Sequence, residues 1–234
     1  MPKRPCAISI TSDDTTIISA DKFGDVYSLP LIPSEAFEPK PATPTPEPTT
    51  SKPFTPAANE LTIHSQRNRK ALENQKRQTN RPSQKSEPSF EHKLLLGHVS
   101  MLTDLALVTS GTRNYIITSD RDEHIRVSRG IPQTHVIQGF CLGHTDFISR
   151  LCVPRERSDL LISGGGDDEL FLWEWESGGL VSKTDLKSHV VSVMRESDSW
   201  KESEESVAAV KLAVSGLYHT REASQDVVVV TCEG

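Results

Sequence analysis

The amino-acid sequence predicts an all-β protein made of repeated small sheets, and three observations support this. The strand-like stretches are short, about four to six residues, rich in β-branched residues and bounded by turn formers. No long stretch carries a clean apolar 3.6-residue period, so helices are not expected to be the main element. The third observation is an internal repeat of about 45 residues, which favours an architecture of similar stacked units.

The first unit is expected at residues 1–32. Three strand-like stretches follow one another there, "CAISI", "TTIISA" and "DVYSLPL". They are separated by "TSDD" and "DKFG", whose Asp, Ser and Gly residues favour turns. We therefore expect three strands of one antiparallel sheet.

A segment of different composition, residues 33–91, interrupts this pattern. Eight prolines lie between Pro33 and Pro56, and such a stretch builds neither a helix nor a sheet ladder. Arg67–Lys85 holds seven Lys or Arg and one acid, a charge of +6; since the whole chain carries −6, the remainder carries −12. We expect a disordered insert whose basic part is a solvated linker, a nuclear localisation signal or an arm that contacts nucleic acid.

The repeat is clear in the remainder of the chain. Gly97-His98 recurs 46 residues later as Gly143-His144, and His189 follows after a further 45. The stretch "IITSDRDEHIRVS" lies 45 residues before "LISGGGDDELFLW", and "IISADKFGDVYSL" lies 99 residues before the first of these. This period, with Gly-His near the start and Trp near the end, is typical of WD40-type β-propellers, which consist of four-stranded blades. The blades are expected at 1–32, 92–138, 139–183 and, in part, 184–234.

The best-formed repeat runs from His144 to Trp175. Its strands are "FISRLCV", "DLLISG" and "ELFLWEW", with "GGDD" as the tight turn between the second and third. Glycine supplies the positive φ angles and the close backbone approach that such a turn uses. A phosphate-binding loop would need GxxxxGK[ST], and no Lys follows here. No acid or His stands at ligand spacing from Asp167-Asp168, so no metal site is expected.

We predict that Asp167 joins His144, Ser163 and Trp173 in one buried structural network. A fully satisfied polar network of this kind makes a blade rigid. These histidines are therefore interpreted as structural, and no residue of the chain is predicted to be catalytic.

The preceding repeat carries an incomplete version of the network. His98, Thr118 and Asp122 match its members, but Ser128 stands where the tryptophan would be. We expect this blade to hold a weaker network.

The turn of that same repeat is unusually charged, with six charged or titratable residues within Asp120–Arg126. One interpretation is a solvated turn whose ion pairs contribute little. The other is a docking surface for a partner, because propellers bind partners through their loops. Arg126 alternates with Ile125 and Val127, so it should point away from the core, and a cation fixed on a strand suits a partner's carboxylate.

Composition and motifs exclude several classes of protein. The four cysteines form no CxxC motif and are interpreted as thiols in a reducing compartment. No apolar run approaches the length of a membrane span, and the first residues lack the apolar region of a signal peptide. No GxSxG, HExxH or P-loop motif points to an enzyme.

Several of these stretches together resemble one family. "ADKFGDVYSLPL", "LLGHVSMLTDLAL", "SDRDEHIRVS", "LGHTDFISRLCV" and "LLISGGGDDELFLWEW" are similar, in order and wording, to the non-catalytic WD-repeat subunit of the eukaryotic tRNA (guanine-N7) methyltransferase. The family propeller has seven blades, so the chain is expected to hold three blades and part of a fourth, truncated at both ends.

The resemblance implies a scaffold that binds and stabilises a separate catalytic subunit, forming a heterodimer that meets tRNA. S-adenosylmethionine would lie on that partner, and the chain itself would carry no cofactor. Carried over to this chain, Arg126 would contact the catalytic subunit, with Lys22, Arg121 and Asp120 nearby. We expect a nuclear protein without membrane contact. Two alternatives remain open: a general WD-repeat adaptor, and an RNA-binding protein that acts through the basic insert.

Overall fold

The computed structural model describes residues 4–33, 90–195 and 211–233. Every strand and helix of this part belongs to one compact unit, Met1–Glu35 with Glu91–Gly234. The described residues form antiparallel strands and one helix, which confirms the predicted all-β class. The predicted insert lies almost wholly outside the described residues.

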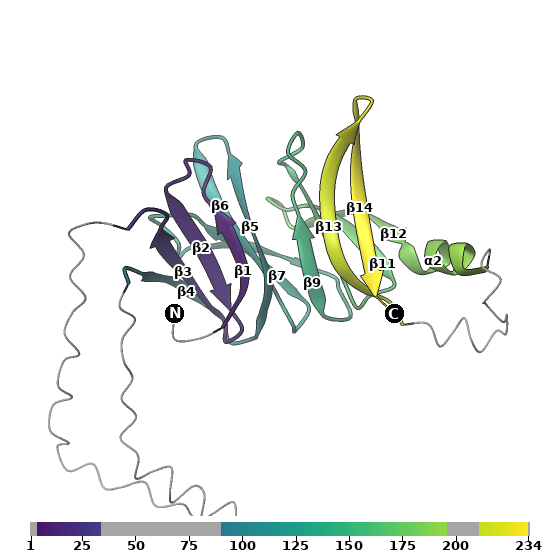
Figure 1. Ribbon diagram of the computed structural model, residues 1–234, viewed down its shortest axis with the longest axis horizontal. Coiled ribbons are helices and arrows are strands. Elements are labelled where there is room, and N and C mark those ends of the chain that lie inside the picture. The colour runs from purple at the N-terminus through teal and green to yellow at the C-terminus, as the bar shows by residue number, and fades with distance from the viewer. Residues whose placement is uncertain (1–3, 34–89, 196–210, 234) are drawn as a thin grey trace, which may run out of the picture. The chain divides into compact units, whose positions relative to one another are not determined.

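The strands form three four-stranded sheets and one two-stranded sheet, and neighbouring strands within each are antiparallel (Figure 1). The first sheet consists of β1 (Pro5–Ile10), β2 (Thr16–Asp21), β3 (Asp25–Pro30) and β4 (Lys93–Gly97). The second consists of β5 (Leu102–Ser110), β6 (Arg113–Asp120), β7 (His124–Arg129) and β8 (Ile137–Leu142). The third consists of β9 (Ile148–Cys152), β10 (Leu160–Gly165), β11 (Glu169–Glu174) and β12 (Gly179–Asp185). The fourth pairs β13 (Ala213–Glu222) with β14 (Gln225–Glu233).

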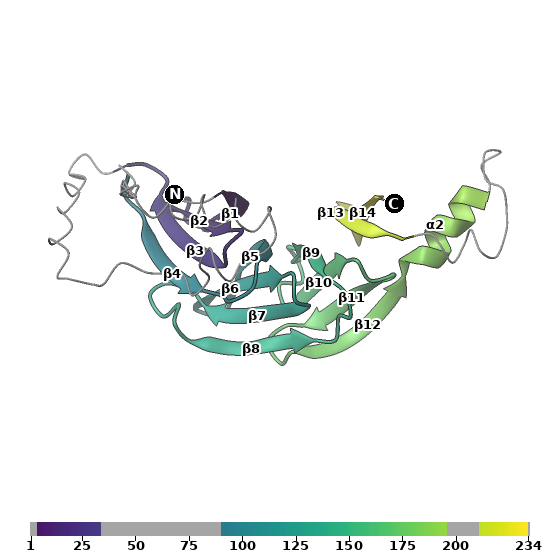
Figure 2. The same ribbon diagram turned by 90° about the horizontal axis from the view of Figure 1, so that it is seen from below.

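The sheets are arranged as blades within this unit. Their first strands follow one another, since β1 contacts β5, β5 contacts β9, and β9 contacts β13. The last strands of the second and third sheets, β8 and β12, lie on the outer side (Figure 2). This radial order is that of an incomplete propeller.

The hydrophobic core lies between successive sheets, because alternate residues of a strand face opposite sides. On β6, Ile116 packs toward the first sheet and Ile117 toward the third, and both are buried. Between the second and third sheets, Trp173 and Trp175 fill the largest share of the core. Each inner blade thus depends on both of its neighbours.

Hydrogen bonds also join neighbouring sheets at their first strands. Asp104 on β5 accepts a bond from the backbone N of Leu151 on β9, at 2.8 Å. Burial raises the pKa of Asp104, and this bond opposes that effect. Arg150 on β9 donates from Nε to the carbonyl oxygen of Ser215 on β13, at 2.7 Å. These bonds fix the relative positions of the blades more specifically than apolar packing does.

The predicted blade boundaries are wrong by about one strand. Residues 93–97 were assigned to the blade 92–138, yet they form β4, which pairs with β3 of the first sheet. The other two boundaries likewise fall within β8 and β12. The cause is that the Gly-His motif stands where the last strand of one sheet ends, before the first strand of the next, so the sequence repeat and the sheet are out of phase.

The predicted strands of the repeat 144–175 are confirmed as β9, β10 and β11. The helix α2 (Leu186–Arg195) was not predicted. It is short, and Asp185 caps its start by accepting a bond from the backbone N of Ser188 at 2.9 Å. Such a cap is difficult to recognise in a sequence dominated by strands.

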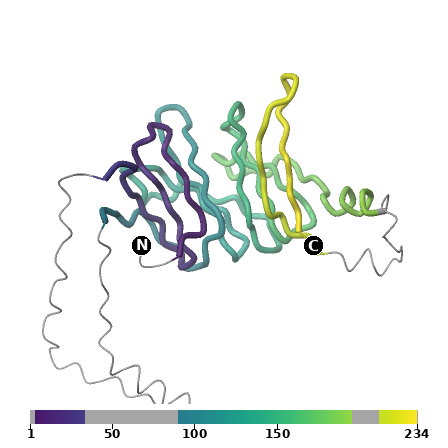
Figure 3. The backbone as a smooth tube through the Cα atoms, in the orientation of Figure 1, coloured from purple at the N-terminus to yellow at the C-terminus, as the bar shows by residue number. Residues whose placement is uncertain are grey.

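The blades have two edges, a hairpin edge and a turn edge. The hairpin edge holds the β1–β2, β5–β6, β9–β10 and β13–β14 connections, whose tips lie together at the top of Figure 3. The turn edge is opposite, because each second strand runs away from its hairpin. It holds the turns and loops at 22–24, 98–101, 121–123, 143–147 and 166–168.

Candidate functional site

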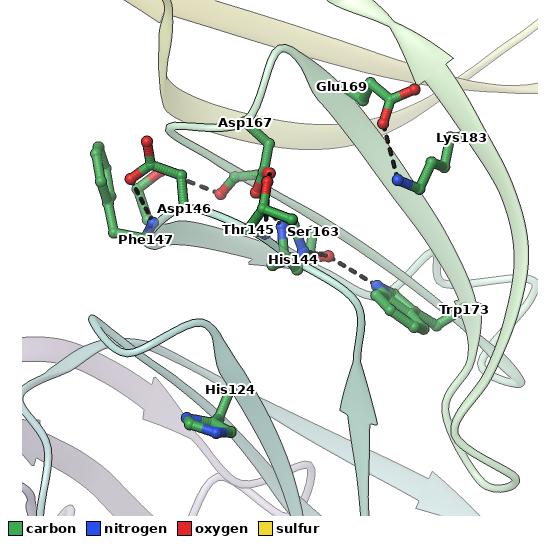
Figure 4. A network of polar contacts seen from close by, with 12 residues as sticks. His124, His144, Thr145, Asp146, Phe147, Ser163, Asp167, Glu169, Trp173 and Lys183 are labelled. Atoms are coloured by element: carbon green, nitrogen blue, oxygen red, sulfur yellow. Dashed lines mark hydrogen bonds and ion pairs between the residues drawn. The ribbon is translucent and has the colours of Figure 1, made fainter.

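The third sheet contains the predicted polar network, complete and at short distances (Figure 4). His144 Nδ1 lies 2.6 Å from Asp167 Oδ2, and His144 Nε2 lies 2.7 Å from Ser163 Oγ. Trp173 donates from Nε1 to Ser163 Oγ at 2.8 Å. Thr145 adds two bonds to Asp167 Oδ1, from its backbone N at 3.0 Å and from its hydroxyl at 2.7 Å. The predicted network of His144, Ser163, Asp167 and Trp173 is therefore confirmed.

One arrangement of protons satisfies every member of this network. Trp173 donates to Ser163, Ser163 donates to His144 Nε2, and the Nδ1–H of a neutral His144 donates to an ionised Asp167. Burial lowers the pKa of His144, although Asp167 opposes that shift. Burial acts to raise the pKa of Asp167, but the bonds from Thr145 and His144 outweigh it and the net shift is downward. Both directions agree with a neutral histidine beside a carboxylate, which is a structural role.

The glycines of "GGGDD" serve close packing at the turn edge. A Cβ atom on Gly165 would lie 1.8 Å from the carbonyl oxygen of Phe147, so no other residue fits without a shift of the backbone. The positive φ angles that were also expected occur elsewhere, for example at Gly24 and Gly143, and not within this run. Gly164 and Gly165 end β10, and the predicted turn between β10 and β11 is formed by residues 166–168.

The second sheet holds a different arrangement. His98 Nε2 and Thr118 Oγ1 lie 3.0 Å apart, as predicted. The predicted place of Asp122 is wrong, because Asp122 lies exposed on the turn and the His98 ring bonds to Thr118 and not to it. The reason is Asp120, whose Oδ1 accepts bonds from the backbone N atoms of Asp122 and His124, at 2.9 and 3.0 Å. That carboxylate shapes the turn and carries Asp122 away from the histidine.

The predicted partner contacts other than Arg126 occupy unequal positions on the turn edge. Lys22 and Arg121 are exposed there, so a role in binding stays a prediction. Asp120 is only 7% exposed, and its carboxylate is used within the turn. This corrects its predicted place among the partner contacts.

Arg126 is half-buried on β7 and held from two sides. Its Nε donates to Ser128 Oγ at 3.0 Å, and its Nη1 donates to the carbonyl oxygen of Gly97 at 3.1 Å. Ile125 and Val127 are both fully buried, so the predicted alternation is confirmed. Burial lowers the pKa of the Arg126 guanidinium. Within the described residues no carboxylate lies in ion-pair distance of Arg126, and the acceptors that hold its guanidinium are both uncharged.

Three exposed apolar side chains on the loops of the turn edge were missed in the sequence: Phe23, Val99 and Met101. Phe23 precedes Gly24, whose carbonyl oxygen accepts the bond of the His98 backbone N at 2.7 Å. Met101 accepts a backbone bond from Arg121 at 2.9 Å. The turns that carry these residues are therefore adjacent. The apolar residues beside the Gly-His motif were the feature of the sequence from which this surface could have been predicted. An apolar and charged surface of this kind is typical of a protein–protein contact.

The stability of the second blade is expected to depend on pH through His98. Burial and then the positive charge of Arg126 lower the pKa of His98 to about 4. In the unfolded chain this histidine takes up a proton near pH 6.5, whereas in the folded protein it stays neutral until about pH 4. The free energy of unfolding therefore falls as the pH drops from about 6.5 toward 4. Allowing for partial exposure, we expect a loss of about 1–2 kcal/mol between pH 7 and pH 5.

Urea unfolding at both pH values measures this loss. His98→Gln should reduce the pH dependence, whereas His124→Gln, at an exposed position on the neighbouring turn, should retain it. An equal slope for His98→Gln and the parent would contradict the assignment.

No cluster of three His, Cys, Asp or Glu side chains suited to a metal occurs among the described residues. In the same part of the chain, no helix has the length and apolarity to cross a membrane. The four cysteines are all free thiols, as predicted.

These features define a class: a WD-type propeller, incomplete in the described residues, in which a buried histidine network joins the strands of the third blade. The family model described as "tRNA methyltransferase TRM82 WD40 domain" matches residues 1–234. The chain therefore belongs to this family, which confirms the interpretation made from the sequence motifs.

Curated relatives support the same family. A tRNA (guanine-N(7)-)-methyltransferase non-catalytic subunit from Sclerotinia sclerotiorum is 56% identical over 100% of this chain and 45% of its own length. The subunit of the same name from Phaeosphaeria nodorum is 51% identical over 100% of this chain and 49% of its own length. The one from Meyerozyma guilliermondii is 33% identical over 99% of this chain and 43% of its own length. The chain thus spans about half the length of the curated relatives it matches. Among solved structures, the WD40 repeats of RRP9 align with a TM-score of 0.45 at 15% identity, over 77% of this chain and 38% of that one.

Proposed function

We propose that this protein is a non-enzymatic scaffold that binds the catalytic subunit of a tRNA (guanine-N7) methyltransferase and stabilises its active conformation. The observation that carries the proposal is Arg126, a half-buried cation without an acidic partner among the described residues, fixed at the turn edge. The names of the relatives, as non-catalytic subunits, supply the identity of the complex.

The mechanism is a shift of population. A partner carboxylate would pair with Arg126, and the apolar side chains of Phe23, Val99 and Met101 would pack around it. The scaffold binds the folded, active catalytic subunit better than its other conformations and so increases the active fraction. In this proposal the catalytic subunit binds S-adenosylmethionine, and the heterodimer binds tRNA. The complex acts in the nucleus.

Co-expression with a methyltransferase catalytic subunit tests the proposal. We expect co-purification and increased N7-methylation of guanine in tRNA, relative to the catalytic subunit alone. The experiment should use this chain and a chain extended to the length of its relatives. Absence of binding by the extended chain would contradict the proposal.

The basic segment Arg67–Lys85 supports a second role, direct contact with RNA. The segment lies outside the described residues, and this role is proposed from its net charge of +6 alone. If it binds phosphates, deleting it should weaken tRNA binding by the complex and reduce the dependence of affinity on salt. Unchanged affinity and salt dependence would leave the linker and localisation roles.

A further inference from the structure

One strand position differs in chemistry between the sheets. Tyr27 on β3, Arg126 on β7 and Phe171 on β11 occupy equivalent places, each directly opposite a hydroxyl residue of the preceding strand. In the first and third sheets the position is aromatic and buried. In the third, Phe171 packs against the His144 ring with centroids 3.9 Å apart. Only the second sheet places a cation there.

A second position changes together with the first. Ser128 stands in the second sheet where Trp173 stands in the third, and both are fully buried. In the third sheet Trp173 donates to Ser163 and completes the histidine network. In the second, the smaller Ser128 accepts the bond from Arg126 Nε instead. The loss of the tryptophan thus provides both space and an acceptor for the guanidinium.

The guanidinium keeps donors for a ligand. It has five N–H groups, of which the Nε–H bonds to Ser128 and one on Nη1 bonds to Gly97. Within the part of the chain that the structure describes, Nη2 makes no hydrogen bond. The second Nη1–H and the two Nη2–H groups remain as donors, and the planar fork of a guanidinium matches a carboxylate. Fixing the fork in advance reduces the entropy lost on binding.

We infer that Ser128 is a positioning residue, which with the Gly97 carbonyl holds the Arg126 guanidinium ready for a carboxylate of the catalytic subunit. The incomplete histidine network of the second blade is the structural consequence of building this site. This inference rests on the proposed function, and names the residue that determines the geometry of its main contact.

A double-mutant cycle tests the inference. The dissociation constant for the catalytic subunit is measured with the full-length protein carrying Ser128→Ala, Arg126→Ala or both, with melting curves for each. Ser128→Ala should weaken binding by about tenfold, the effect of losing one hydrogen bond to a charged group. In the Arg126→Ala background it should have no further effect, because it acts through Arg126. Ser128→Thr, which keeps the hydroxyl, should restore binding in part.

Ser119→Ala is the matched control. Ser119 is a fully buried serine of the same sheet whose hydroxyl bonds to Thr103 at 2.9 Å and not to Arg126. It should leave affinity unchanged. Equal affinity of Ser128→Ala and parent overturns the inference, and so does an equal loss in the Arg126→Ala background. If Arg126→Ala itself has no effect, the proposed docking site fails with it, so the two failures are distinguishable.

Discussion

Arg126→Glu is expected to weaken binding to the catalytic subunit by about a hundredfold or more, without unfolding the blade. The substitution removes the cation and places a carboxylate opposite the partner's carboxylate, and disrupting a desolvated charge pair costs several kcal/mol. The fold should persist because Arg126 lies on the face of β7 opposite the buried Ile125 and Val127. The dissociation constant and the melting temperature, measured on the same preparation, separate the two effects.

Arg113→Glu is the control for this experiment, since Arg113 is exposed at the hairpin edge and changes charge by the same amount. It should leave binding within a fewfold of the parent. Equal affinity of Arg126→Glu and parent would refute the proposed docking site. An equal loss for Arg113→Glu would instead indicate a general effect of net charge.

Asp167→Ala is expected to destabilise the third blade by about 1–3 kcal/mol, because it leaves buried donors without an acceptor. Asp167 accepts bonds from His144, from the backbone of Thr145 and from the Thr145 hydroxyl. Removing the carboxylate orphans the Nδ1–H of a buried imidazole. Urea unfolding at neutral pH, followed by tryptophan fluorescence, measures the loss near Trp173.

Asp168→Ala is the matched control, one residue further along the chain. Asp168 is ion-paired with Lys187 at 3.0 Å, but the pair is solvent-accessible and is worth little. Its removal should change stability by less than about 0.5 kcal/mol. If Asp167→Ala and Asp168→Ala have the same effect, the network does not stabilise the blade as we describe.

The third blade shows which features of the fold could be predicted from the sequence. The alternation of its strands, the glycine turn and the spacing of His144, Ser163, Asp167 and Trp173 are local or periodic, and the structure has them as predicted. The prediction for Asp122 was wrong, because the sequence pattern contains no information on which of two nearby carboxylates accepts the backbone N–H bonds of a turn. Asp120, the last residue of β6, does so with a buried carboxylate, whereas Asp122 lies exposed on the turn.

The sequence by itself determined the all-β class, the repeat and the family, because strand alternation and motif spacing are properties of the chain read in order. Only the tertiary structure decided that β4 belongs to the first sheet, across the insert, since pairing with β3 depends on hydrogen bonds between residues far apart in sequence. The tertiary structure likewise decided the burial and the hydrogen-bond partners of Arg126. The sequence shows only that a cation lies on a strand. The hydrogen bonds that Arg126 donates to Ser128 and Gly97 form in the folded blade, where the strands and loops meet. The lack of an acidic partner among the described residues is likewise a property of the folded blade.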